Sequence, residues 1–121
     1  MIALLKSLFG SGVAACTASE AKALLDAGHA CVIDVREAGE YAGGSVPGAL
    51  HVPLSRLAAR GVDALAGLPI PDAGPILLLC LSGARSRSAG AILAGRYAAR
   101  LRNLSGGILA WSAAGFPVVR G

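Results

Sequence analysis

Runs of apolar residues separated by polar turns recur along the chain, and they predict short buried strands. The clearest run is residues 76–79, which contains only isoleucine and leucine. An apolar run without polar alternation is typical of a strand that is covered on both faces, as in a parallel sheet. With less regular segments included, we expect strands at 13–16, 31–35, 50–52, 76–79 and 101–104.

Helical patterns fill the segments between these strands. Thr17 and Glu20 have the spacing of a capping box, and Leu24 and Leu25 follow on the inner face of the helix that it opens. Further helical segments are expected at 36–41, at 55–65, after residue 86 and at 108–114. Strands that alternate with helices predict an α/β domain whose mainly parallel sheet is covered on both faces. In such sheets, ligands bind at the carboxyl ends of the strands.

Cys80 stands where the apolar run 76–79 stops and a turn into a helix begins. The unpaired N–H groups and positive dipole end of a helix N-terminus stabilise an anion and lower the pKa of a cysteine. Gly83 permits a tight loop, Arg85 adds a cation, and Ser86 is expected to cap the helix. The alternative is an inert core cysteine, which is the commoner fate of this residue type. The loop residues favour the reactive thiolate.

Composition and charge limit the classes of function. The chain has 121 residues, which is enough for one domain, and 55% of them are hydrophobic while 4% are aromatic. The net charge is +4, and five arginines lie between residues 85 and 102. Such a cluster could suggest nucleic acid, but side chains that stack on bases are scarce and no nucleic-acid motif is present. We therefore expect no nucleic-acid partner, and a field that attracts small anions.

The cysteines and histidines do not form a metal-binding pattern. Cys16, Cys31 and Cys80 lack paired spacing, and His29 and His51 are separate from them. We expect no metal and no other cofactor. Unpaired cysteines fit a reducing compartment, so a cytoplasmic protein is expected, with Cys16 and Cys31 as core residues.

Residues 1–12 form a separate, partly apolar segment that ends in Gly-Ser-Gly. The segment is too short and too interrupted to span a bilayer. We expect a tail at 1–12 that packs loosely on the domain or touches a partner, and a domain at 13–121. Residues 13–16 weakly resemble a lipoprotein cleavage box, but 7–15 is a poor hydrophobic core for a signal, so secretion is the lesser alternative.

Three segments in order carry a resemblance to a known family. The first covers Val-Ile-Asp-Val-Arg-Glu at 32–37 and continues to residue 54; the second is Cys-Leu-Ser-Gly-Ala-Arg-Ser at 80–86. The third runs from Leu-Ser-Gly-Gly at 104–107 to residue 118. Together they resemble the rhodanese domain of single-domain bacterial proteins, over residues 17–118. That family usually has a histidine where Ser45 stands here, which should change a turn contact and leave activity intact.

The resemblance implies a five-stranded parallel sheet in the order 1-5-4-2-3 and sulfurtransferase chemistry. Cys80 would alternate between thiol and persulfide. It would take a sulfane sulfur from a small anionic donor, thiosulfate or a persulfide, and pass it to a thiol or a protein acceptor. The chemistry needs an exposed sulfur and a ring of N–H donors around it. The residues expected to supply that ring are Leu81, Ser82, Gly83, Ala84, Arg85 and Ser86.

Charged residues near this loop are expected to bind the donor or to hold the loop in place. Arg85 could pair with the oxyanion of the donor, or it could lock the loop through Asp34 or Glu37. Arg36 is expected to join an ion pair with Glu40 or Asp34 near the floor of the pocket. Asp34 and Arg36 are therefore expected to support the pocket and not to react.

Two rival functions use related features. Cysteine phosphatases and arsenate reductases also hold a thiolate among amides, but phosphatases have one residue more than the four between Cys80 and Arg85. The smaller ring should suit one sulfur atom, and no aspartate is obviously placed as a general acid. The other rival is a rhodanese module that carries sulfur or binds a partner with little turnover of its own. The usual sign of a non-catalytic module is loss of the loop cysteine, and Cys80 is present.

Overall fold

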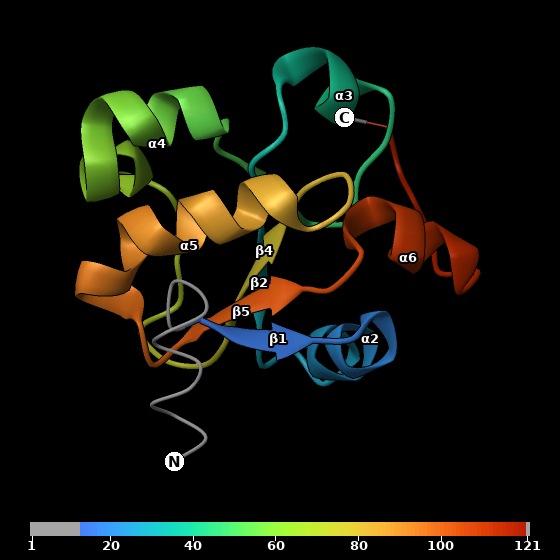
Figure 1. The fold of residues 1–121 in the computed structure, drawn as a ribbon. Helices are drawn as coiled ribbons and strands as arrows, with labels where there is room; N and C mark the ends of the chain where they lie inside the picture. Colours follow the sequence, from blue (N-terminus) through green and yellow to red (C-terminus); the bar gives the residue numbers. More distant parts are fainter. Residues whose placement is uncertain (1–12, 121) are drawn as a thin grey trace.

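The computed structural model describes residues 13–120 and contains one five-stranded sheet (Figure 1). The predicted tail at 1–12 lies outside the described residues. The strands are β1 (Ala14–Cys16), β2 (Cys31–Asp34), β3 (Leu50–His51), β4 (Ile76–Leu79) and β5 (Leu101–Leu104). They are all parallel and follow the order β1-β5-β4-β2-β3. This confirms the fold class and the strand order that the sequence led us to expect.

Strand β4 lies at the centre of the sheet. It pairs with β2 on one side, where Leu79 faces Asp34, and with β5 on the other, where Leu78 faces Asn103. Its four residues are fully buried, because helices cover both faces of the sheet. That double cover explains why the sequence of β4 has no polar alternation. The strand ends in the middle of the carboxyl edge and delivers Cys80 there.

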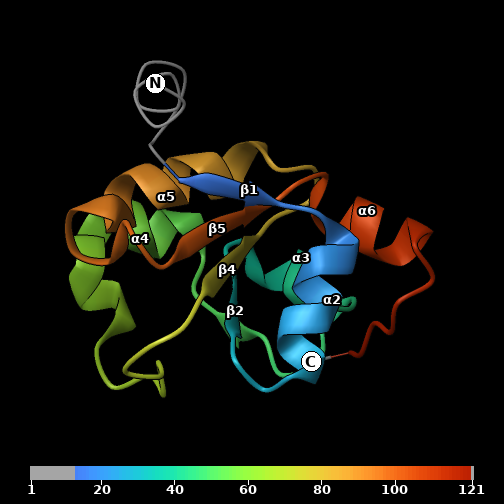
Figure 2. The same cartoon turned by 90° about the horizontal axis from the view of Figure 1, so that it is seen from below.

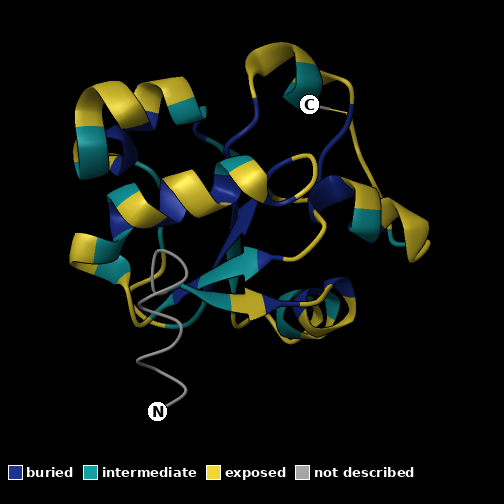
Figure 3. Ribbon diagram, viewed as in Figure 1, coloured by how far each residue is buried: buried dark blue, intermediate teal, exposed yellow. Residues whose placement is uncertain are grey.

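Helices cover the two faces of the sheet in separate groups (Figures 1 and 2). The helices are α2 (Ala18–Asp26), α3 (Ala38–Ala42), α4 (Leu54–Arg60), the 3₁₀ helix η1 (Gly61–Leu65), α5 (Ala84–Tyr97) and α6 (Gly107–Ala113). One core cluster joins α4, η1 and α5 to the sheet, and a second joins α2 and α6. The buried residues run along β4 and the inward sides of α5 and α6 (Figure 3). Between residues 13 and 120, no helix has the length and apolar character needed to cross a membrane.

Local signals account for most helix ends. The capping box of α2 is formed, since Thr17 Oγ1 accepts from the Glu20 amide at 3.1 Å and Glu20 Oε1 accepts from the Thr17 amide at 2.9 Å. The single helix expected at 55–65 is wrong. Gly61 adopts a φ of 60° and ends α4, and a 3₁₀ turn then carries the chain to Leu65. A positive φ is open to glycine without steric cost, so the break occurs at this residue.

Candidate active site

Cys80 follows the last residue of β4 directly, and α5 begins four residues later. Gly83 is the N-cap of α5, with a left-handed φ of 108°. The loop is therefore short, and the N-terminus of a 14-residue helix lies beside the cysteine. The placement of Cys80 at the carboxyl edge, next to a helix N-terminus, agrees with the prediction from the sequence.

Backbone and hydroxyl groups contact the sulfur of Cys80. The amide of Gly83 donates a hydrogen bond to Sγ at 2.9 Å, and the thiol lies 3.5 Å from Ser86 Oγ. Burial raises the pKa of the Cys80 thiol, but the hydroxyl of Ser86 and the amides of Ser86, Gly83 and Ser82 lower it by more. The net result is a pKa below the ordinary cysteine value, because hydrogen bonds to the sulfur favour the anion. Of the expected ring of six residues, Ser82, Gly83 and Ser86 are the ones with this effect.

The other two cysteines have the opposite environment. Cys16 is buried among the residues of the α2 and α6 face, and half-buried Cys31 packs on the other cluster. Burial raises the pKa of both thiols. This agrees with their assignment as core residues, and it leaves Cys80 as the cysteine whose surroundings favour a thiolate.

The expectation of an exposed sulfur is wrong. Cys80 keeps 1% of its surface accessible and belongs to the core cluster of the α4 and α5 face. The side chain points inward from the strand end, where Gly83 and Ser86 close around it, while Leu81 and Ser82 lie outside on the surface. The packed residues therefore separate the sulfur from solvent in this structure.

Ser86 does not cap α5, which is a second correction. It is the third residue of the helix, and the N-cap is Gly83. Its buried hydroxyl instead donates to the Gly83 carbonyl, 3.1 Å away, and makes a short contact with Oδ1 of Asn103. The single hydroxyl proton of Ser86 is therefore shared between the Gly83 carbonyl and Asn103 Oδ1. A thiolate at Cys80 would be a third acceptor for it.

Asn103 is a site residue that the sequence analysis missed. It lies on β5, and its amide nitrogen donates to the Gly83 carbonyl at 3.3 Å while its oxygen accepts from Ser86. The side chain therefore ties the loop glycine to the helix serine. The sequence does show a polar amide near the end of the strand at 101–104, which could have marked Asn103 as a site residue. The strand order is needed to place this amide beside Cys80.

Gly107 brings α6 against the same loop. Its φ is +58°, and a Cβ at this position would overlap the carbonyl of Cys80. The close approach allows the amide of Ile108 to donate to that carbonyl at 2.8 Å, and the amide of Leu109 to donate to the carbonyl of Leu81 at 3.3 Å. The loop is thus fixed by the starts of two helices, α5 and α6.

Arg85 forms a bidentate ion pair with Glu40, at 2.6 and 2.7 Å. Neither of the expected carboxylates, Asp34 or Glu37, is its partner. The hydrogen bonds from the guanidinium hold the pKa of Glu40 at about 2, and the pair raises the pKa of Arg85. Since both side chains are about one-third exposed, the pair ties α3 to the loop at the surface of the protein.

Asp34 and Arg36 form a buried ion pair, one of the two partners expected for Arg36. The guanidinium donates to both carboxylate oxygens, with a shortest distance of 2.7 Å, and also to the carbonyl of Gly44 at 2.6 Å. Ser45 Oγ donates to Asp34 at 2.6 Å, and the backbone of Ser45 pairs with that of Val119. The network joins the end of β2 to the 44–45 segment, and Ser45 is part of it.

A comparison with known families matches the Rhodanese-like domain over residues 17–114. The chain belongs to this family. Among curated rhodanese relatives, a sulfurtransferase of Allochromatium vinosum is 35% identical over 96 residues, covering 79% of this chain and 84% of that protein. Thiosulfate sulfurtransferase 18 of Arabidopsis thaliana is 33% identical over 108 residues, covering 83% of this chain and 79% of that protein.

A solved rhodanese-like structure supports the same assignment. The human single-domain sulfurtransferase TSTD1 superimposes with a TM-score of 0.71 at 27% sequence identity, over 82% of this chain and 95% of the human chain. The chain therefore has the rhodanese-like fold, and several of its relatives are sulfurtransferases.

Proposed function

We propose that this rhodanese-like domain is a sulfurtransferase that carries sulfur as a persulfide on Cys80. The single observation that carries the proposal is the 2.9 Å hydrogen bond from the Gly83 amide to Sγ, at the N-terminus of α5. The amide stabilises a thiolate, and the lowered pKa of Cys80 acts in the same direction. The sulfurtransferase relatives give the reaction class.

The reaction takes place in two half-reactions. The Cys80 thiolate attacks the outer sulfur of thiosulfate, the bond between the two sulfur atoms of thiosulfate breaks, and sulfite leaves with the electron pair. Cys80 then carries an anionic persulfide. An acceptor thiolate attacks its outer sulfur, and the thiolate of Cys80 leaves. The charges and atoms balance without a metal or an external oxidant.

Burial of Cys80 adds a requirement to this cycle. The added sulfur lies about 2 Å beyond Sγ, so the persulfide needs space that the 1% exposed residue does not have at rest. Movement of the surface residues Leu81 and Ser82 supplies it in the proposal. Loop motions of this kind are compatible with turnover on the microsecond to millisecond scale.

The same burial favours a second candidate, a sulfur carrier that turns over slowly with free donors. In that case, a partner protein opens the loop, delivers or receives the sulfur, and dissociates. The two candidates share the Cys80 persulfide and differ in whether small molecules alone complete the cycle. The phosphatase alternative is weaker, because Glu40 holds the guanidinium that would have to bind a phosphate.

Intact mass spectrometry after incubation with thiosulfate tests the proposal. We expect a gain of one sulfur, about 32 Da, that cyanide removes. Cys80→Ser should not gain this mass, whereas Cys31→Ser, the matched control, should. A persulfide that survives in Cys80→Ser would mean that another thiol is the carrier. Steady-state turnover with thiosulfate and with glutathione persulfide then separates the enzyme from the carrier.

A further inference from the structure

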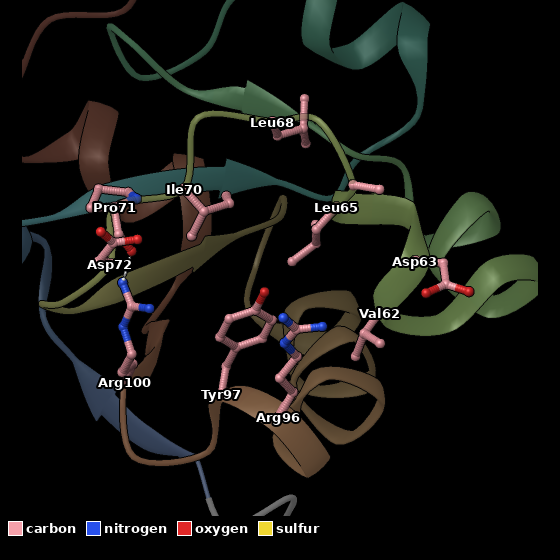
Figure 4. A pocket seen from close by; sticks show the side chains of 11 residues that line it. Val62, Asp63, Leu65, Leu68, Ile70, Pro71, Asp72, Arg96, Tyr97 and Arg100 are labelled. Atoms are coloured by element: carbon pink, nitrogen blue, oxygen red, sulfur yellow. Dashed lines mark hydrogen bonds between the residues drawn. The ribbon is translucent and has the colours of Figure 1, made fainter.

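The arginines of α5 and of the turn that follows it lie at both ends of the sheet. Arg96 and Arg100 line a cavity of about 510 Å³ at the amino end, opposite to Cys80 (Figure 4). Arg85, the second residue of α5, is the arginine of the loop at 80–86. The charge of Cys80 is one of the causes that raise the pKa of Arg85, so the guanidinium lies within electrostatic range of the sulfur. Arg85 is therefore the loop cation that a negatively charged sulfur donor would meet.

Glu40 already occupies this cation. Two guanidinium nitrogens of Arg85 donate to the two carboxylate oxygens of Glu40, at 2.6 and 2.7 Å. A bidentate pair of this kind uses the edge of the guanidinium that binds an oxyanion. The two side chains are about one-third exposed, so a donor in solution can reach the pair. It would meet a neutral pair there instead of a free positive charge.

The pair is held from the side of α3 as well. Glu40 is the third residue of this helix, and its Oε1 accepts from the amide of Glu37 at 3.2 Å. The guanidinium of Arg85 keeps the pKa of Glu40 at about 2, so the carboxylate is charged at neutral pH. Arg36 cannot replace Arg85, because it is buried in its own ion pair with Asp34. The positive charges of Arg85 and Arg36 are therefore both balanced.

This arrangement bears on the charge of the donor. Thiosulfate is a dianion, and its approach to the Cys80 thiolate brings like charges together, which is unfavourable without a nearby cation. A protonated thiol persulfide, R–S–SH, carries no charge on its two sulfur atoms. The Cys80 thiolate attacks its outer sulfur, the bond between the two sulfur atoms breaks, and R–S⁻ leaves with the electron pair. The total charge is one negative unit before and after this step.

We propose that Glu40 is a specificity-determining residue, which neutralises Arg85 and so disfavours thiosulfate relative to a thiol persulfide. The inference rests on the proposed transfer of sulfur by Cys80. Its first test, however, measures the binding of an inert anion and needs no transfer. Removal of the Glu40 charge should free Arg85 and create a binding site for dianions at the loop.

Sulfate is an inert dianion that resembles the sulfonate end of thiosulfate, and an NMR titration of the Gly83 amide measures its Kd. Glu40→Gln removes the charge but keeps an acceptor for the Glu37 amide, so α3 stays capped. We expect this variant to bind sulfate about tenfold more tightly than the wild type, a change of about 1.4 kcal/mol. Asp63→Asn removes an exposed carboxylate on η1, and this charge-matched control should leave Kd unchanged.

Steady-state kinetics with two donors then tests specificity. In Glu40→Gln, kcat/KM for thiosulfate should rise about tenfold, mainly through a lower KM. Benzenethiosulfonate has the same reacting sulfur but half the charge, so its gain should be only about threefold. Both gains should disappear when Arg85→Gln is added to Glu40→Gln. They should persist with Arg87→Gln, which removes an exposed arginine on the same helix.

Three results would overturn the role of Glu40. An unchanged sulfate Kd in Glu40→Gln would mean that the ion pair does not restrict the loop. A gain that survives the loss of Arg85, or that Asp63→Asn reproduces, would mean that net charge acts instead. Equal gains for the two donors would exclude selection by charge. Tighter sulfate binding with no sulfur transferred to Cys80 would instead overturn the proposed function and support control of anion binding by Glu40.

Discussion

The surroundings of its sulfur atom distinguish Cys80 from the other two cysteines. All three sulfur atoms lose hydration, which raises the pKa of a thiol. Only at Cys80 do the hydrogen bonds from Ser86, Gly83 and Ser82 exceed this effect and lower the pKa. A core position and a thiolate are therefore compatible, because the donors are fixed by the turn that buries the sulfur.

Substitution of Ser86 tests the largest of these hydrogen-bond contributions. Ser86→Ala removes the hydroxyl next to Sγ, so the pKa of Cys80 should rise and the thiolate should form at higher pH. The pH dependence of the iodoacetamide reaction rate measures this, and its midpoint should move upward. Ser88→Ala, an exposed serine on the same helix, is the control and should leave the midpoint in place. An unchanged midpoint in Ser86→Ala would leave the amides as the only source of the lowered pKa.

Arg85 and Glu40 offer a second test at single residues. Arg85→Gln removes the guanidinium that holds the pKa of Glu40 at about 2, so this pKa should rise toward 4.5. Because the folded pKa is depressed, the stabilisation by the pair is complete above about pH 4.5 and is lost as the pH falls toward 2. Carboxyl carbon NMR of Glu40 follows the titration. Arg87→Gln, an exposed arginine on α5, should leave it unchanged; an equal shift in both variants would point to net charge instead of the pair.

Backbone contacts between elements add to the side-chain hydrogen bonds around the loop. The start of α6 approaches the loop closely because Gly107 has no Cβ, and the Cys80 and Leu81 carbonyls accept amides from this helix. The start of α5 supplies Gly83 and Ser86. Two helices from different parts of the chain therefore fix one short turn.

Two glycine substitutions should have opposite effects on stability. Gly107→Ala places a Cβ onto the Cys80 carbonyl at a positive φ, and the backbone conformation alone should cost about 1–2 kcal/mol in the free energy of unfolding. Gly95→Ala in α5 meets no atom within 4 Å and should stabilise the protein by up to about 1 kcal/mol. Urea unfolding of both variants measures the two changes in the free energy of unfolding and shows whether their signs are opposite. A neutral Gly107→Ala would mean that α6 can shift away from the loop without loss.

Over the whole molecule, the Asp34 and Arg36 pair connects parts of the chain that are distant in sequence. It joins the carboxyl end of β2 to residues 44–45, and Ser45 pairs in turn with the backbone of Val119 near the carboxyl end of the described chain. Both side chains are buried. A buried charge is stable only beside its partner, because water cannot reach it to take the place of the partner.

Removal of one partner should therefore destabilise the domain strongly. Arg36→Leu leaves the carboxylate of Asp34 buried without its cation, and we expect a loss of about 3–5 kcal/mol in the free energy of unfolding. Chemical denaturation at pH 7 gives the value. Arg56→Leu removes an exposed arginine on α4 and should change stability by less than about 0.5 kcal/mol. Similar losses in the two variants would refute a special role for the buried pair.

Neighbouring residues were enough to predict the local elements and the family. Three features depend on residues that are close in sequence, so they could be predicted. They are the unbroken apolar run of β4, the capping box at Thr17 and Glu20, and the junction of Cys80 with a helix. Three segments in order led to the family, and with it to the strand order.

Which distant groups meet at the loop depends on how the helices and strands pack against one another. Glu40 reaches Arg85 over 45 positions and Asn103 reaches Ser86 over 17, and both contacts depend on which strands and helices are neighbours in space. The burial of Cys80 was also decided there, by the closing of α5 and α6 around the turn. Periodicity and capping report interactions within a few residues, whereas solvent access and ion-pair partners follow from packing between elements.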